Sequence, residues 1–510
     1  MKVAGGKIAA FAFLLVLVAC TTLSYDYPRQ ATSAFASYNQ TYLGQLFSAA
    51  ETRNPGKSGV VLVTAGRDAF TSRMAMTELA QKSLDLQYYI WDEDQSGRIL
   101  ADAILRSANR GVRVRLLVDD LNVGKRDSAV AALDAHPNIE IRLFNPFANR
   151  GSKFIEIAGD FRRLNHRMHN KLMVADNALA LLGGRNIGDH YFDVSDDANY
   201  RDLDVAVAGP AVREASQIFD YFWNGKWSFP VAAVIKRSFS AEELKAARQA
   251  LKNTINRGGY PYPVYEETAV MRRRIADIGK SLVWAPAYVV WDDPANTAAG
   301  QEHGEIVRAL AGKLDKLNSE LIMENAYFVP GERGTDALRT LSERGVRVRI
   351  LTNSLSSNDV LAVHAGYAKY RKQLLEDGVE LFEVRADSAK VQQTLISGDS
   401  KAALHTKAFV FDRESIFVGS FNLDPRSANI NTEIGLYVES PQLAARLANF
   451  MDEGVRPGNS YRLDLDANGN IIWITETDGQ VVRFTSDPNS TVGQRAVTTI
   501  IGVLPVEGQL

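Results

Sequence analysis

The chain has 510 residues, of which 46% are apolar and 23% are charged, as in a globular protein of two or three domains. This composition excludes a disordered tail, a coiled coil and a protein with several membrane spans. Lys and Arg number 58 and Asp and Glu number 60, so the net charge of −2 counts against nucleic acid as the main partner. A single cysteine excludes an internal disulfide, a thiolate zinc site and an iron–sulfur cluster.

The N-terminus has the pattern of a secretory signal. Lys2 and Lys7 precede an apolar run from Ile8 to Ala19, which is shorter than the about 20 residues that a helix needs to cross a bilayer. The run ends at Cys20, and the last four residues, LVAC, resemble a bacterial lipobox, in which the cysteine is diacylated and becomes the new N-terminus. A plain cleaved signal with an incidental cysteine, or a short uncleaved anchor, is the alternative.

From this pattern we expect a membrane-anchored lipoprotein. Residues 1–19 would be the lipoprotein signal peptide, Cys20 would carry the lipid, and residues 20–60 would form a polar N-terminal tether. We expect the protein on the periplasmic side of a bacterial inner or outer membrane. The outer membrane is slightly favoured, because Thr21, not Asp, follows the cysteine.

The next elements in the chain occur twice. The hexapeptide RGVRVR spans 110–115 and recurs at 344–349, an offset of 234. Each copy follows an amphipathic helical stretch, has a glycine suited to end that helix, and leads into an alternating strand. The predicted helices cover 99–108 and 335–342, and the predicted strands cover 112–118 and 346–351. Helix, glycine and strand in this order are typical of α/β domains.

A second repeated segment carries the chemistry. The segment from 169 to 186 and that from 405 to 422 share the pattern H-x-K-x4-D-x6-G-[G/S]-x-N, at an offset of 236. Two offsets that agree so closely predict a tandem duplication. We therefore expect similar domains at 61–230 and 300–450, joined by a connector at 231–299. A C-terminal β-rich appendage at 451–510 has turn signals at Asn468-Gly469 and Asp478-Gly479.

The spacing of the motif suits the binding of a phosphate. On a strand, residues i and i+2 share a face, so each motif directs an imidazole and an ammonium the same way. The downstream small residues would let backbone N–H groups approach a phosphate, and the asparagine would add a side-chain donor. The predicted catalytic residues are His169, Lys171, Asp176, His405, Lys407 and Asp412, and the predicted phosphate-binding residues are Gly184, Asn186, Ser420 and Asn422.

With both motifs intact, the sequence resembles the phospholipase D superfamily over about 60–450. The amino-acid sequence is most similar to those of C-type bacterial cardiolipin synthases in five segments. These are QYYIWDEDQSG (87–97), MHNKLMVAD (168–176), GGRNIGDHYF (183–192), SFNLDPRSANINTE (420–433) and LPVEGQL (504–510). The resemblance implies an α/β fold of two mixed sheets flanked by helices. The two halves would be related by a pseudo-twofold axis, with the active site at their junction.

The resemblance also implies a mechanism that needs no metal or cofactor. One histidine attacks phosphorus and the other moves protons, and which does which stays open. The family places a histidine-orienting acid after the asparagine: Glu433 fits in the second half and Asp202 in the first, with Asp204 as the alternative. Asp176 and Asp412 lie seven residues from the histidines, and we expect them to be structural rather than to carry protons.

The implied reaction makes cardiolipin from phosphatidylglycerol and a second phospholipid, which could be phosphatidylethanolamine, through a phosphatidyl-histidine intermediate. The expected partners are these phospholipids and a membrane surface, with no nucleic acid, and the need for an accessory protein stays open. The alternatives are a hydrolytic phospholipase D that releases phosphatidic acid, a secreted nuclease and a non-catalytic lipoprotein scaffold. Unlike the better-known cardiolipin synthases, the chain has no paired N-terminal membrane helices.

Overall fold

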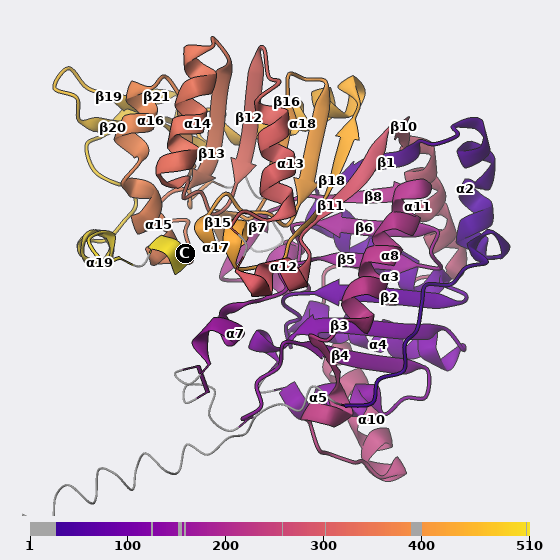
Figure 1. The fold of residues 1–510 in the computed structure, drawn as a ribbon. Coiled ribbons are helices and arrows are strands. Elements are labelled where there is room, and N and C mark those ends of the chain that lie inside the picture. Colours follow the sequence, from indigo (N-terminus) through magenta and orange to yellow (C-terminus); the bar gives the residue numbers. More distant parts are fainter. Residues whose placement is uncertain are drawn as a thin grey trace, which may run out of the picture.

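The computed structural model describes residues 27–123, 126–150, 156–157, 160–257, 259–300, 302–388, 400–505 and 507–509 (Figure 1). The predicted signal peptide, Cys20 and the first residues of the tether lie outside the described residues. Within the described ranges no helix is long and apolar enough to cross a membrane.

The first half is built on a nine-stranded sheet in the order β10-β1-β8-β6-β5-β2-β3-β4-β9. Its strands are β1 (Ser58–Val63), β2 (Ser83–Tyr88), β3 (Arg113–Asp119), β4 (Ile139–Phe144), β5 (Leu172–Ala175), β6 (Leu179–Gly183), β8 (Asp204–Ala208), β9 (Ser228–Pro230) and β10 (Val283–Ala285). The accompanying helices are α2 (Tyr42–Arg53), α3 (Gly66–Leu79), α4 (Gln95–Asn109), α5 (Asp127–Asp134), α7 (Phe161–Asn165), α8 (Pro210–Asn224), α9 (Val231–Val234), α10 (Ala241–Arg257) and α11 (Thr268–Ser281).

The second half is built on a ten-stranded sheet in the order β11-β18-β17-β16-β12-β13-β14-β19-β20-β21. Its strands are β11 (Ala287–Trp291), β12 (Glu320–Asn325), β13 (Arg347–Asn353), β14 (Glu380–Val384), β16 (Lys407–Phe411), β17 (Ser415–Gly419), β18 (Ile434–Glu439), β19 (Ser460–Leu465), β20 (Ile471–Thr477) and β21 (Gln480–Phe484). Its helices are α12 (Pro294–Ala299), α13 (Glu305–Leu314), α14 (Gly331–Glu343), α15 (Leu361–Ala368), α16 (Arg371–Glu376), α17 (Pro425–Asn429), α18 (Pro441–Gly454) and α19 (Val492–Gly502).

The two sheets repeat one topology, which confirms the predicted fold class. The run β1-β8-β6-β5-β2-β3-β4 has the same order and direction of pairing as the run β11-β18-β17-β16-β12-β13-β14. The predicted helices and strands around RGVRVR are α4 with β3 and α14 with β13. Gly111 (φ 90°) and Gly345 (φ 82°) end these helices in the left-handed region, as their position after a helix predicts.

The connector and the C-terminal segment complete these sheets. Within the connector, β10 pairs with β1 in the first sheet, and β11 pairs with β18 in the second. The predicted C-terminal hairpins are β19, β20 and β21, and they extend the second sheet from β14. Asp478 and the glycines at 469 and 479 have the positive φ angles that such tight turns require.

One apolar core spans both halves. Helix α8 of the first half and α18 of the second lie between the two sheets, and α18 contacts β1 as well as its own strands. The buried cluster contains Val174 and Val205 from one sheet, and Val410 and Leu436 from the other. A two-stranded sheet of β7 (Ala198–Arg201) and β15 (Lys401–Leu404) also joins the halves, in parallel register. The halves are therefore held in a fixed relative position.

The motif aspartates have a structural place in this fold. Asp176 follows β5 with φ 54°, and its carboxylate accepts hydrogen bonds from the backbone N–H groups of Lys82 (2.7 Å) and Ser83 (2.9 Å), where β2 begins. Asp412 follows β16 with φ 50° and accepts from three N–H groups at the start of β12. Each aspartate therefore fixes the motif strand to its neighbour, at the end of the strand away from the histidine.

An Asp176→Ala variant should unfold more readily while keeping its turnover per folded molecule. Several N–H donors would lose their acceptor, which costs roughly 2–4 kcal/mol in unfolding free energy. Urea unfolding would measure that loss, and an assay normalised to folded protein would measure turnover. A catalytic role for Asp176 would be indicated by turnover that falls at least 100-fold in molecules that remain folded.

Candidate active site

The two motif histidines lie at the junction of the halves, and each is tied to the other half through its backbone. The N–H of His169, just before β5, donates to the carbonyl of Thr432 (2.9 Å). The N–H of His405, just before β16, donates to the carbonyl of Arg201 at the end of β7 (2.8 Å). Thr432 and Arg201 directly precede the two predicted histidine-orienting acids. These bonds therefore bring each acid beside the histidine of the opposite half.

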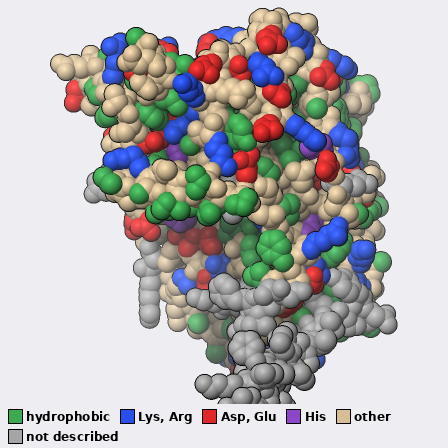
Figure 2. All heavy atoms as spheres, turned by 60° about the vertical axis from the view of Figure 1, so that its left-hand side comes forward, with side chains coloured by type: hydrophobic (Ala, Val, Ile, Leu, Met, Phe, Trp, Pro, Cys, Tyr) green, Lys and Arg blue, Asp and Glu red, His purple; other side chains and the backbone are tan. Residues whose placement is uncertain are grey.

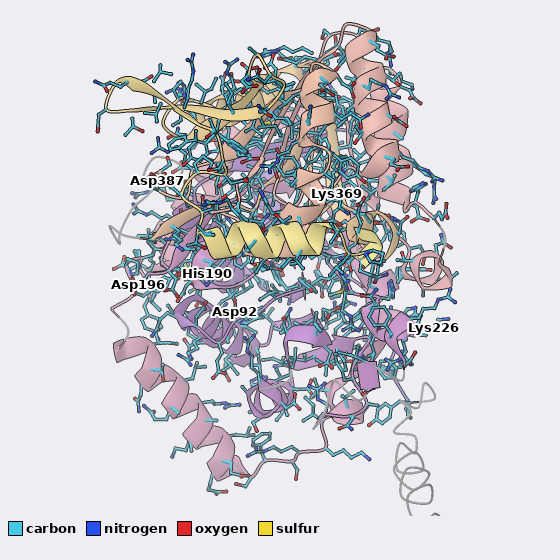
Figure 3. All side chains as sticks on the ribbon, turned by 90° about the vertical axis from the view of Figure 1, so that its left-hand side faces the viewer. Asp92, His190, Asp196, Lys226, Lys369 and Asp387 are labelled. Atoms are coloured by element: carbon cyan, nitrogen blue, oxygen red, sulfur yellow. The ribbon has the colours of Figure 1, made fainter. Side chains whose placement is uncertain are left out.

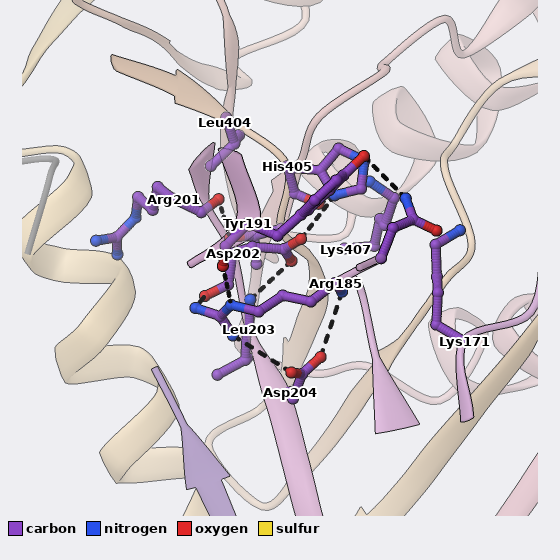
Figure 4. A network of polar contacts seen from close by, with 12 residues as sticks. Lys171, Arg185, Tyr191, Arg201, Asp202, Leu203, Asp204, Leu404, His405 and Lys407 are labelled. Atoms are coloured by element: carbon purple, nitrogen blue, oxygen red, sulfur yellow. Dashed lines mark hydrogen bonds and ion pairs between the residues drawn. The ribbon is translucent and has the colours of Figure 1, made fainter. Parts of the chain in front are cut away.

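The histidine–carboxylate pairs are accordingly crossed between the halves. His169 Nδ1 lies 2.8 Å from Glu433 Oε2. In the other pair, which Figure 4 shows, His405 Nδ1 lies 2.6 Å from Asp202 Oδ2. Both carboxylates are fully buried and both imidazoles nearly so. A carboxylate on Nδ1 places the proton there and leaves Nε2 with a free lone pair. The alternative acid, Asp204, instead pairs with Arg73 (2.9 Å).

The two carboxylates sit in different electrostatic surroundings. Burial alone would raise the pKa of Glu433, but the facing His169 and Lys171, with a hydrogen bond from the Ser420 hydroxyl, hold that pKa below its usual value. Burial raises the pKa of Asp202, against the opposing effect of Arg185 and the two motif lysines. Glu433 is thus the more firmly ionised of the two partners.

Both imidazoles are neutral in the free site. Burial lowers the pKa of His169 to about 4, against the opposing effect of Glu433. Burial also lowers the pKa of His405 well below its usual value, and the neighbouring Lys407 and Lys171 lower it further. A neutral imidazole can act as a nucleophile. A bound anionic phosphodiester would raise the pKa of the partner that must donate a proton.

Both motif lysines are buried. Lys171 Nζ donates to the carbonyl of His169, and Lys407 Nζ donates to the carbonyl of His405, each at 2.6 Å. Burial lowers the pKa of Lys407 to about 8 and that of Lys171 well below its usual value. Because a buried ammonium gains much from an anionic partner, these lysines favour a phosphate between them.

The small residues of the motif contact the strands and acids beside the histidines, and their predicted contact with a phosphate stays a prediction. The N–H of Gly184 donates to the carbonyl of Leu203 (3.0 Å), and that of Ser420 donates to the carbonyl of Ile434 (2.8 Å). A Cβ at position 184 would lie 2.1 Å from Asp202 Oδ1, so only glycine lets this carboxylate approach. At the equivalent place, the Ser420 hydroxyl bonds Glu433.

The two motif asparagines differ in their surroundings. Asn186 accepts a hydrogen bond from the N–H of Ile90 (3.1 Å) and donates to the hydroxyl of Tyr191 (2.9 Å). Asn422 is buried, and its Oδ1 has no partner among the described residues. Their predicted contact with a phosphate stays a prediction.

Tyrosines around the histidines were not predicted. The ring of Tyr89 meets His169 edge-on at 4.9 Å, Tyr191 meets His405 edge-on at 5.1 Å, and Tyr200 stacks on His405 at 5.3 Å. Together, these rings and the carboxylates fix the orientation of each imidazole. Tyr191 and Tyr200 follow the first motif but contact the histidine of the second, so no spacing within one half predicts these contacts. Tyr89 lies 80 positions before His169, and no sequence signal links the two.

The geometry agrees with the comparisons to known proteins. A family model described as "Cardiolipin synthase, PLD-like domain" matches residues 74–223 and 310–454. The chain belongs to this family. The predicted membership of the phospholipase D superfamily is thereby confirmed, and the chain is a phosphatidyltransferase of that superfamily.

Relatives match over most of the chain. Cardiolipin synthase C of Escherichia coli (strain K12) is 36% identical over 462 residues, which are 89% of this chain and 97% of that protein. A cardiolipin synthase of Oceanobacillus iheyensis is 25% identical over 78% of this chain and 68% of its own. The crystal structure of phosphatidylserine synthase from Haemophilus influenzae shares the fold with a TM-score of 0.56, at 15% identity, covering 91% of this chain and all of that one.

The crossed pairs predict the effect of Asp202→Asn in this phosphatidyltransferase. The amide would keep the shape but could present an N–H to His405 and favour the wrong tautomer, so kcat should fall roughly 100- to 10,000-fold. Steady-state kinetics with a phospholipid substrate would measure this. Asp204→Asn serves as the matched control, since Asp204 bonds no histidine, and equal losses in both variants would contradict the assignment.

The pKa of Lys407 predicts an alkaline limit to activity. Below about pH 8 the ammonium is charged and can hold the phosphate, whereas above that pH it loses its proton. The value of kcat/KM should therefore fall as the pH rises through about 8. A bound phosphodiester raises this pKa, so the limit in kcat should lie at higher pH. A profile of kcat/KM that is flat from pH 7 to 10 would contradict the role of Lys407.

Proposed function

We propose that this protein makes cardiolipin, by moving a phosphatidyl group from one phospholipid to a free glycerol hydroxyl of phosphatidylglycerol. The observation that carries the proposal is the pair of buried, neutral imidazoles, each with a carboxylate on Nδ1 and a lysine beside it. Similarity to cardiolipin synthases over most of the chain supports the choice of product. One imidazole for attack and one for proton transfer suit a reaction that exchanges one alcohol on phosphorus for another.

The chemistry proceeds in two displacements at one phosphorus. Nε2 of one histidine attacks the donor phosphodiester, and the leaving alcohol takes a proton from the other, protonated histidine. The product is a phosphatidyl-histidine. The now neutral second histidine then takes the proton of the acceptor hydroxyl, whose oxygen attacks phosphorus and releases the first histidine. Lys171 and Lys407 stabilise the anionic phosphoryl oxygens in both steps.

We further propose that the enzyme works while tethered to a membrane on the periplasmic side, through a lipid on Cys20. The lipobox-like LVAC supports this part of the proposal. The predicted tether is wrong from Tyr42 onward, because α2 spans Tyr42–Arg53 and buries Leu43 and Phe47 in the core, so any tether ends before this helix. The substrates lie in bilayers, so a tether would keep the site at a high local concentration of lipid. Labelling with a radioactive fatty acid, lost in Cys20→Ser, would test the attachment.

The product is tested with the acylated protein in vesicles of phosphatidylglycerol, with and without phosphatidylethanolamine. Mass spectrometry should find cardiolipin, and His169→Ala should lower its rate at least 1,000-fold, since the covalent route needs both histidines. His303→Ala is the control. Among the described residues His303 forms hydrogen bonds with Arg333, Arg308 and Asn429, none of which belongs to either motif. Phosphatidic acid as the sole product would replace this proposal with hydrolysis, and a fully active His169→Ala would overturn the mechanism.

A further inference from the structure

Helix α19 presents an apolar face to the solvent. Its residues Val497 and Ile500, and Val503 and Leu504 just after it, are exposed, with Ile500 at 62% and Val503 at 81%. Gly493 and Ala496 lie on the same exposed face. These positions recur every three or four residues, so they form one stripe along the helix, without a charged residue. We call this stripe, residues 493, 496, 497, 500, 503 and 504, the α19 ridge.

The amphipathic pattern of α19 is inverted relative to a helix that packs on a core. Thr498, on the opposite side, is buried. Arg495 turns back and donates to the carbonyl (2.8 Å) and hydroxyl (2.9 Å) of Ser490. A surface helix normally buries its apolar face and exposes its polar face. The polar residues of α19 are satisfied within the protein, whereas the ridge faces outward.

The ridge is rigidly held. A capping box of Thr491 and Gln494 starts the helix, and α19 packs along α15. After the helix, Glu507 accepts hydrogen bonds from Lys369 (3.0 Å) and the hydroxyl of Tyr370 (2.6 Å). Gln509 bonds Asn165 of the first half (2.7 Å). The segment is therefore fastened at both ends and to both halves, so the ridge is a preformed surface.

The segment that carries the ridge is attached close to both motifs. Its packing partner α15 begins just after Asp359, which accepts a hydrogen bond from Tyr327 beside Lys407. Asn165, at the other end of the segment, accepts from Arg426 in α17, just after the second motif (2.7 Å). Figure 3 shows α19 crossing one side of the molecule above His190 and Asp92. Figure 2 shows hydrophobic side chains along the edge of a hollow that contains acidic and histidine side chains.

We propose that the α19 ridge docks on the surface of a phospholipid bilayer and holds the active-site entrance against it. This inference rests on the proposed function, because the substrates of such an enzyme lie in that bilayer. An uncharged apolar stripe with polar flanks is the form of a helix that lies in the interface plane, buried to the depth of the headgroups. The closeness of the segment to both motifs favours a lipid surface over a protein partner, since a substrate headgroup must pass from the bilayer to the histidines.

The test compares one variant on two forms of substrate. Ile500→Glu should lower turnover on phosphatidylglycerol vesicles roughly tenfold or more, because a charge replaces an apolar side chain at the interface. Turnover on dispersed short-chain phosphatidylglycerol should not change, since the site itself is intact. Val270→Glu is the matched control, at 41% exposure on α11, which lies on the opposite side of the molecule in Figure 1. Equal vesicle turnover by Ile500→Glu and the parent chain would overturn the proposal.

A second measurement does not depend on the reaction. An environment-sensitive fluorophore on Val497→Cys, in a chain with Cys20→Ser and so no other cysteine, should shift to the blue when vesicles are added. The same label on Val270→Cys should not shift. A shift at position 497 without vesicles, rising with protein concentration, would show that a second copy of the chain covers the ridge and would overturn the proposal. Absence of cardiolipin with a clear vesicle-induced shift would instead count against the proposed product alone.

Discussion

The structure depends on two hydrogen bonds between halves of the chain that are far apart in sequence. His169 pairs with Glu433, 264 positions away, and His405 pairs with Asp202, 203 positions away. Neither half alone has an imidazole with its orienting carboxylate. The halves must therefore keep their relative position to within a few tenths of an ångström, which explains the apolar layer of α8 and α18 between the sheets and the β7–β15 pairing beside the site.

The second constraint is charge. Lys171 and Lys407 are buried ionisable groups, and so are the two nearby carboxyl groups, Glu433 and Asp202. Burial of charges is costly unless each is paired, so the free site is held near neutrality. A phosphodiester brings one further negative charge, which favours protonation of an imidazole. The substrate thus helps to create the general acid that its own cleavage needs, while the nucleophile stays neutral.

The sequence predicted the repeated fold, and it predicted the histidines and lysines that lie together at the junction, because each motif is encoded within one half. A strand places His169 and Lys171 on one face, and a duplication repeats that arrangement. The sequence could not predict that the acids cross between the halves, because the crossing is set by how the two sheets meet. Nor could it predict how Gly184 and Ser420 accommodate the acids. A small residue in such a motif can let its N–H approach a phosphate, or it can leave room for a carboxylate. The sequence pattern is the same in both cases, and here Gly184 and Ser420 lie against the carboxylates.

Helix α19, at the surface, is a second case in which a sequence pattern predicts the element but not its tertiary contacts. The spacing of Val497, Ile500 and Leu504 gives an amphipathic helix, but periodicity does not tell whether the apolar stripe faces a core or the solvent. Only tertiary contacts decide it: α19 packs along α15, and Glu507 and Gln509 fasten the segment after the helix. Those contacts reach α15 and α7, which belong to different halves. The fastening that keeps the ridge outward is thus built across the same junction as the active site, so a lipid surface met by the ridge would have a fixed orientation relative to both histidines.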